Sequence, residues 1–185
     1  MTPLRALPSG IRLMFASALA LALAAAPARA QPTEEAVKAA FLPKFARYVD
    51  WPAAARPAPR APFQLCVIGR DPFGRLLDQS AASELIDGHA IAVRRLATPD
   101  GAAGCHVAFV QGAGAQSTTR LLEALRGQPV LTVTDARAGP QRGMIHFTVA
   151  GGRVRFFIDD AEAARRQLSI SSRLLALALG VRQRR

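Results

Sequence analysis

The chain has 185 residues, half of them apolar and 6% aromatic, with a formal net charge of +11 at pH 7 and an isoelectric point near 11.5. This length is enough for one domain with a buried core. The basic charge is almost all arginine and is scattered, with no long basic run and no interleaved aromatic residues, so the sequence argues against nucleic-acid binding.

Residues 1–30 have the features of a secretory signal peptide. Arg5 and Arg12 precede an apolar run over residues 13–26, and Ala28-Arg29-Ala30 has the small-x-small pattern of a cleavage site. The alternative is an uncleaved membrane anchor, but the run is short for a span and ends at Pro27. We therefore expect export to the periplasm and a mature chain, residues 31–185, that does not span the membrane.

The mature chain begins with a predicted helix over Glu34–Val49. Its apolar residues recur every four positions, at Val37, Phe41, Phe45 and Val49. Pro43 is expected on the opposite side of the helix, with a kink there, and Trp51-Pro52 is expected to end the helix.

The next segment combines a strand, a tight turn and a capped helix. Phe63–Ile68 is a short apolar, β-branched run that predicts a strand buried on both faces. Gly69 ends the strand, and Asp71 followed by Pro72 predicts the capped start of a helix over residues 72–82.

The following residues alternate strands with one helix. Strands are predicted over 91–96 (half-exposed), 105–110 and 130–134, and a helix capped by Ser117 over 118–125. Residues 144–149 and 153–158 flank Ala150-Gly151-Gly152 and predict a β-hairpin.

The chain is predicted to end in helix. Asp159 or Asp160 is expected to cap it, Ser171 or Ser172 to restart it, and an apolar face continues to Gly180 before a frayed arginine tail. The whole order predicts one α/β domain: a three-layer sandwich with a mixed, mostly parallel sheet flanked by helices, a C-terminal hairpin and a closing helix.

No catalytic constellation is found in the sequence. Gly69-x-x-x-x-Gly74 lacks the Lys and Ser/Thr of a phosphate-binding loop, and His89, His106 and His146 lack the paired spacing of metal ligands. We predict no enzyme activity, no metal and no cofactor. Asp135, at the end of a core strand, has either a functional role or the more ordinary role of a turn or cap.

Arg153, Arg155 and Phe157 alternate on one face of the hairpin, as a solvated edge or a contact surface.

The chain resembles the YfiR family of periplasmic proteins over about residues 36–179. The resemblance rests on the following segments: Ala39-Ala-Phe-Leu-Pro-Lys-Phe-Ala-Arg-Tyr-Val-Asp-Trp-Pro52, Leu65-Cys-Val-Ile-Gly-Arg-Asp-Pro-Phe-Gly74, Gly104-Cys-His-Val-Ala-Phe-Val110, Leu131-Thr-Val-Thr-Asp135, Gly143-Met-Ile145, Gly152-Arg-Val-Arg-Phe156 and Leu168-Ser-Ile-Ser-Ser-Arg-Leu-Leu175.

The resemblance implies a dimeric, non-enzymatic regulator that binds the periplasmic domain of an inner-membrane diguanylate cyclase and represses it, which lowers cyclic di-GMP and restrains biofilm formation. Candidate partner-binding residues are Arg153, Arg155, Phe157 and Arg173. The alternative function is a periplasmic small-molecule binding module that serves a sensor kinase or an uptake system.

The resemblance also implies a disulfide between Cys66 and Cys105. Both cysteines lie in apolar strands that we expect to be neighbours, and the periplasm is oxidising. The alternative is two buried free thiols. The chain departs from the family pattern at Pro43 and in having no second cysteine pair between Thr134 and Thr148.

Overall fold

A computed structural model describes residues 31–184, and the predicted signal peptide lies outside these residues. In the described part, an eight-stranded sheet forms the centre of the fold. Its spatial order is β10 (Gly180–Arg182), β8 (Arg153–Asp159), β7 (Ile145–Ala150), β6 (Leu131–Asp135), β5 (Val107–Gln111), β2 (Phe63–Gly69), β4 (His89–Leu96) and β3 (Leu85–Ile86).

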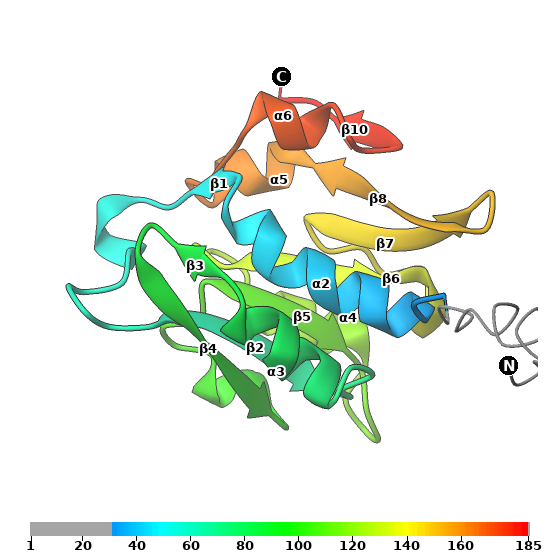
Figure 1. Cartoon of the computed structure of the whole chain (residues 1–185), viewed down its shortest axis with the longest axis horizontal. Helices are drawn as coiled ribbons and strands as arrows, with labels where there is room; N and C mark the ends of the chain where they lie inside the picture. Colours follow the sequence, from blue (N-terminus) through cyan, green and yellow to red (C-terminus); the bar gives the residue numbers. More distant parts are fainter. Residues whose placement is uncertain (1–30, 185) are drawn as a thin grey trace, which may run out of the picture. The chain divides into compact units, whose positions relative to one another are not determined.

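The sheet is mostly parallel. Only the β7–β8 hairpin and the β3–β4 pair are antiparallel. A separate two-stranded sheet pairs β1 (Val49–Asp50) with β9 (Ser169–Ile170). Figure 1 shows α2 crossing in front of the large sheet.

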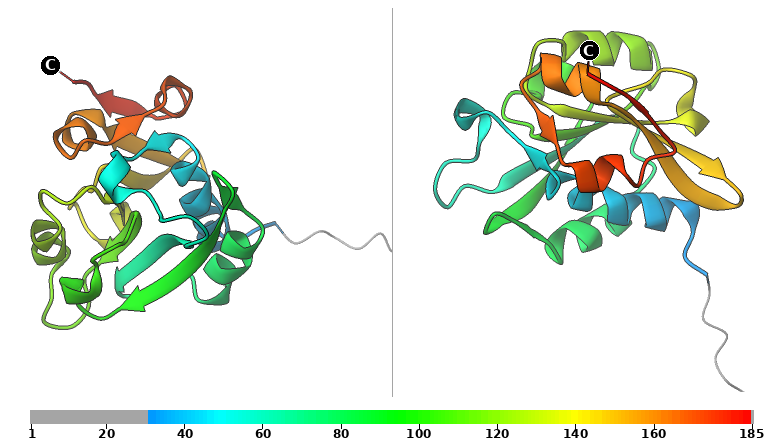
Figure 2. Two further views of the ribbon diagram at one scale, coloured as in Figure 1. Left: turned by 90° about the vertical axis from the view of Figure 1, so that its left-hand side faces the viewer. Right: turned by 90° about the horizontal axis from the view of Figure 1, so that it is seen from above.

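Helices cover both faces of the large sheet. They are α2 (Glu34–Ala46), α3 (Arg75–Ala82), α4 (Thr118–Ala124), α5 (Asp160–Arg165) and α6 (Ser172–Leu175), with 3₁₀ turns at Ala53–Ala55, Pro99–Gly101 and Ala136–Ala138. The right-hand view of Figure 2 shows α4 and α5 on one side of the sheet and α2 and α3 on the other. This is the predicted three-layer α/β sandwich.

Two apolar clusters fill the spaces between the layers. The larger lies beneath α2 and includes Phe45, Phe109 and Phe147, all less than 2% exposed. The smaller lies beneath α4 and includes Leu121 and Leu125. β2 contributes alternate residues to both clusters, which confirms the prediction of a strand buried on both faces.

Several local predictions are confirmed with small shifts of their ends. The hairpin forms with Ala150 opposite Arg153. The Ser117 hydroxyl accepts a hydrogen bond from the Arg120 amide at 3.3 Å and so caps α4. Asp159 and Ser171 are the caps of α5 and α6.

The first helix is shorter than predicted and turned about its axis. α2 ends at Ala46, and Val49 pairs with Ile170 in the small sheet. A four-residue repeat drifts around a helix of 3.6 residues per turn, so the predicted stripe does not stay on one face. The buried face is centred on Leu42, and the prediction that Pro43 faces away from the core is wrong, because Pro43 is buried.

The second helix starts three residues later than predicted. Gly74 is its N-terminal flanking residue, and Arg75 is its first residue. The Asp71 carboxylate instead accepts hydrogen bonds from the amides of Phe73 at 2.7 Å and Gly74 at 3.2 Å. Asp71 therefore closes a turn before the helix, an alternative that short polar side chains readily adopt.

The predicted closing helix is present as α5 and α6, but it ends at Leu175. Its predicted continuation to Gly180 and the predicted frayed arginine tail are wrong, because β10 follows and Arg184 pairs with Asp160. α6 has one turn, and β10 then pairs in parallel with β8. The Leu179 amide donates to the Phe156 carbonyl at 2.8 Å. Pairing with β8 satisfies backbone groups that a helix ending at Gly180 would leave at an open edge.

Candidate functional site

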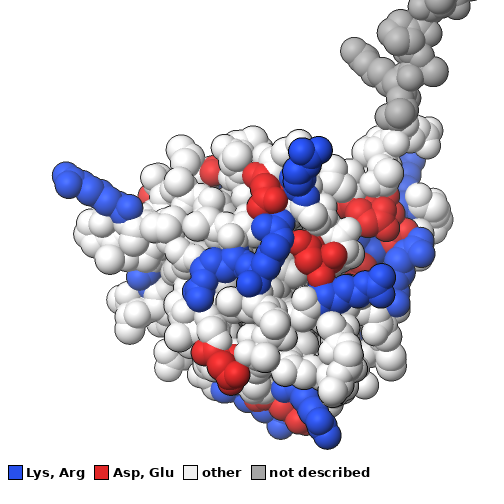
Figure 3. All heavy atoms as spheres, turned by 90° about the horizontal axis from the view of Figure 1, so that it is seen from below, with Lys and Arg blue, Asp and Glu red and all other residues white. Residues whose placement is uncertain are grey.

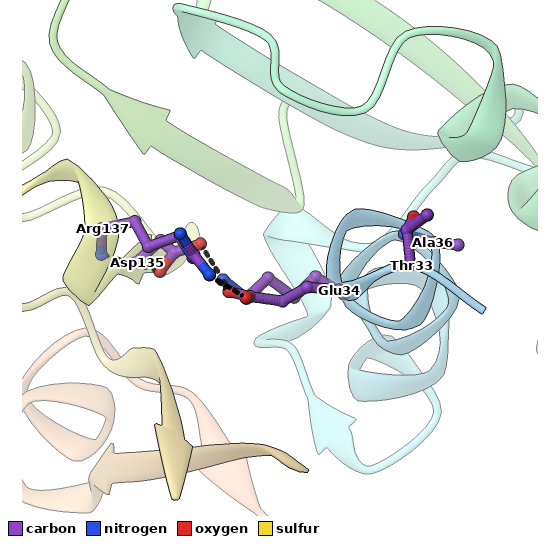
Figure 4. A network of polar contacts seen from close by, with 6 residues as sticks. Thr33, Glu34, Ala36, Asp135 and Arg137 are labelled. Atoms are coloured by element: carbon purple, nitrogen blue, oxygen red, sulfur yellow. Dashed lines mark hydrogen bonds and ion pairs between the residues drawn. The ribbon is translucent and has the colours of Figure 1, made fainter. Parts of the chain in front are cut away.

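A buried ion network lies where α2 meets the carboxyl end of β6. The Lys38 ammonium contacts the carboxylates of Glu34 and Asp135. Lys38 is 2% exposed, and the side chain of Asp135 is 9% exposed. Figure 4 shows Arg137 and Glu34 pointing toward one another beside Asp135. Two carboxylates thus neutralise a cation that the core would otherwise exclude.

Local structure places each member of this network. The Thr33 hydroxyl accepts from the Ala36 amide at 3.2 Å and fixes the first turn of α2, which puts Glu34 and Lys38 on one face. Asp135 ends β6, and its other carboxylate oxygen accepts from the Arg137 amide at 3.0 Å. Asp135 therefore has the predicted capping role and an ion-pair role together.

The electrostatics of the network strongly favour an ionised Glu34. Hydrogen bonds from the exposed Arg137 guanidinium, at 2.7 Å, and from Lys38 lower the pKa of Glu34 to about 2, against the opposing effect of burial. The carboxylate thus stays charged at any physiological pH, and the network is a fixed structural feature above that pKa.

A cavity of about 480 Å³ opens beside the network. It lies at the carboxyl ends of β2, β5 and β6, and its lining includes Lys38, Arg70, Gln111 and Asp135. The chain passes from β2 to β4 on one side and then to β5 on the other, so the strand order reverses there. Such reversal points are the usual ligand sites of open α/β sheets.

The predicted partner-binding residues come from two elements. Arg153 and Arg155 are exposed on β8, and Phe157 is half-buried on the same side of the strand, beneath the Arg142 guanidinium at 4.7 Å from the ring centre. Arg173 is exposed on α6. The sheet thus brings three of the four together, and Arg173 lies on a separate helix.

The predicted disulfide is present. Cys66 and Cys105 are joined, with their Cα atoms 5.9 Å apart. β2 and β5 are parallel neighbours, as expected, but β5 begins at Val107, so Cys105 lies in the preceding loop. Because Cys105 is outside the ladder, strand register does not restrict the bond. Both cysteines belong to the cluster beneath α4 and are at most 5% exposed.

Charged side chains alternate in sign over the surface seen from below in Figure 3, where arginines lie beside carboxylates. Among the exposed ion pairs of the chain, Arg95 donates to Asp71 at 2.7 Å and to Asp78 at 3.0 Å. The described residues contain no group of three or more metal-ligating side chains. Within residues 31–184, no helix has the length and hydropathy needed to cross a membrane.

The ion network and its cavity were missed by sequence reasoning. Lys38 and Asp135 are 97 positions apart, and only the spacing of Glu34 and Lys38 on one helix face was a visible signal. His106 and His146 are both buried with hydrogen-bonded Nδ1 atoms; His146 lies on β7, whereas His106 precedes β5.

The structure is therefore an α/β domain with two notable features. The ion network of Glu34, Lys38 and Asp135 holds α2 to the end of β6, and the exposed side of β8 carries arginines. A model of the YfiR/HmsC-like family matches residues 35–179. The chain therefore belongs to the YfiR/HmsC-like family, whose members are periplasmic regulatory proteins. A search among curated proteins found no match.

Proposed function

We propose that the mature protein is a periplasmic regulator that represses an inner-membrane diguanylate cyclase by binding its periplasmic domain. The observation that carries this proposal is the family match over residues 35–179. Binding alone does not repress an enzyme, because a ligand shifts an equilibrium only by its differential affinity for two states. The protein must therefore bind the inactive form of its partner more tightly, and it acts as a homodimer in the proposed complex.

The proposed contact surface is the outward side of β8, formed by Arg153, Arg155 and Phe157, with Arg173 on α6 as a further contact. Two exposed guanidinium groups and a half-buried ring fit an acidic partner surface with an apolar residue at its centre. The arginine side chains are exposed, so their substitution should change partner binding and leave the fold intact.

The test is a genetic and biochemical comparison of matched variants. Deletion of the gene should raise cyclic di-GMP, and the wild-type gene should restore the low level. Arg155→Glu should fail to restore it, whereas Arg120→Glu, an exposed charge reversal on α4, should restore it fully. Unchanged cyclic di-GMP on deletion, together with no cyclase cross-linked to the protein in membranes, would contradict the repressor role. A kinase cross-linked in place of a cyclase would redirect the proposal to a sensor kinase.

The location and mass of the mature chain test the proposed address. The periplasmic fraction should contain a product whose intact mass corresponds to a chain that starts at Gln31. A full-length product bound to membranes would show that the leader is an anchor.

A second candidate function is a small-molecule binding module. The cavity at the carboxyl ends of β2, β5 and β6 favours it, since its volume of about 480 Å³ is within the range of ligand sites. Saturable binding of a metabolite at this cavity, with unchanged cyclic di-GMP in the deletion strain, would favour this function over the first.

A further inference from the structure

Four strands place a row of residues on the sheet face opposite α2. Thr134 on β6 is paired with His146 on β7, His146 with Phe157 on β8, and Phe157 with Gly180 on β10. Paired residues of neighbouring strands share a face, and their sequence neighbours Phe147 and Phe156 point into the cluster beneath α2. The cluster beneath α4 takes no residue from β7 or β8. A cavity of about 530 Å³ opens over three residues of this row, His146, Phe157 and Gly180.

His146 presents a hydrogen-bond donor to this cavity. The Thr134 hydroxyl accepts from the Gly143 amide at 2.8 Å and lies 2.9 Å from His146 Nδ1. Thr134 is fully buried, so its hydroxyl proton needs an acceptor within the protein. Within residues 31–184, that acceptor is His146 Nδ1. Nδ1 therefore accepts, and the ring proton is on Nε2. His146 is 4% exposed and lines the cavity, and its Nε2 has no hydrogen-bond partner among the described residues.

Two arginines line the same cavity. The Arg182 guanidinium forms an ion pair with Asp159, with Nη1 3.1 Å from Oδ2, and the other Asp159 oxygen accepts from the Glu162 amide at 2.8 Å. Arg142 lies over the Phe157 ring and has no ion-pair partner in the described part of the chain. Burial, and then the charge of Arg142, lowers the pKa of His146, so the ring is a neutral donor. With Asp159 already neutralised by Arg182, the cavity carries a net positive charge.

We propose that this cavity is a binding site for a phosphoryl group, held by His146 Nε2–H and by the guanidinium groups of Arg142 and Arg182. The planar guanidinium fork matches phosphate oxygens, and a neutral imidazole donates without adding a charge that burial would oppose. The volume of about 530 Å³ exceeds the size of a phosphate ion, so the group is part of a larger molecule, either a soluble phosphate ester or a phospholipid headgroup. This site does not depend on the proposed cyclase partner.

The first experiment uses the mature protein from Gln31 and inorganic phosphate as the probe. Phosphate is titrated against chloride at constant ionic strength, and the amide signals of Gly143 and Gly180 are followed by NMR. We expect saturable shifts at these glycines. Arg142→Ala should weaken the affinity by about tenfold or more, the size expected for one charge-assisted contact. Arg182→Ala should also weaken the affinity. The matched control Arg120→Ala, an equal loss of charge on α4, should leave it unchanged.

The second experiment distinguishes the two sources. The protein would be sedimented with phosphatidylglycerol vesicles. Co-sedimentation that is lost in Arg142→Ala and is inhibited by free phosphate would identify a lipid headgroup. Saturable phosphate binding without vesicle binding would identify a soluble phosphate ester. Two results would overturn the proposal: shifts that do not saturate, or equal weakening by Arg142→Ala and Arg120→Ala. Circular dichroism of each variant establishes that it is folded.

Discussion

Substitution of Glu34 by Gln tests whether the ion network at the end of β6 stabilises the fold. The neighbouring charges lower the pKa of this carboxyl from 4.5 to about 2. At 1.36 kcal/mol for each unit of pKa, the preference for the ionised form corresponds to about 3 kcal/mol of stability at neutral pH. The Glu34 side chain is 17% exposed, so solvent screens it only in part. Glu34→Gln should therefore lower the unfolding free energy by roughly this amount.

The sign of the pH dependence follows from the lowered pKa. A carboxyl whose pKa is lower in the folded state stabilises the protein above the unfolded pKa of 4.5, and this stabilisation is lost as the pH falls toward about 2. Wild-type protein should thus lose about 3 kcal/mol more than Glu34→Gln between pH 5 and pH 2. At pH 7 the variant should melt about 6–12 °C lower.

Urea unfolding of the mature protein at several pH values measures this difference. The matched control is Glu35→Gln, which removes an equal charge from the same helical turn outside the ion pairs described for the chain. Added salt should reduce the Glu34 effect only in part, because Arg137 is exposed but Lys38 is buried. Equal acid dependence in Glu34→Gln and wild type would refute the reasoning.

Two further predictions concern contacts between β2 and the segment around β5: the close approach of Gly69 to Gln111 and the Cys66–Cys105 disulfide. A Cβ at Gly69 would lie 2.1 Å from the Gln111 carbonyl oxygen, at a φ of +85°, so Gly69→Ala should cost more than about 2 kcal/mol in urea unfolding. Gly114→Ala, at a φ of +57° in open space, should cost only about 1 kcal/mol, and equal costs would contradict the steric argument. Denatured periplasmic protein should contain no free thiols, and Cys66→Ser should cost about 4 kcal/mol for the loop closed over 39 positions without abolishing folding. Two free thiols per chain would contradict the bond.

The parts of the fold that were predicted correctly are those determined by residues close together in the sequence. The apolar run of β2, the glycines of the β7–β8 turn and the Ser117 cap each act over a few positions, and each is confirmed. Strand β10 was not predicted, because the apolar run that leads to Gly180 fits either a helix or a strand. The free edge of β8 decides between them, and that edge exists only in the folded sheet.

The sites could not be predicted in the same way, because their residues meet only through the topology. In the sequence Lys38 is one of two lysines on the first helix, and its partner Asp135, 97 positions later, is brought beside it only by the fold. Likewise, His146 is an ordinary strand histidine in sequence, and its free Nε2 follows from the Thr134 hydroxyl that occupies Nδ1. The predicted partner residues on β8 could be grouped because strand alternation alone places them on one side.

The same alternation links the phosphoryl cavity to α2 through two strands. His146 and Phe157 face the cavity, whereas the adjacent Phe147 and Phe156 contact Phe45 of α2, with ring centres 5.5 Å and 5.1 Å away. Protein cores are close-packed, so β7 and β8 cannot shift under a bound ligand without moving these rings against α2. A ligand that moves the β7–β8 hairpin would therefore also move α2 on the opposite face of the sheet. The exposed arginines of β8 would move with the hairpin.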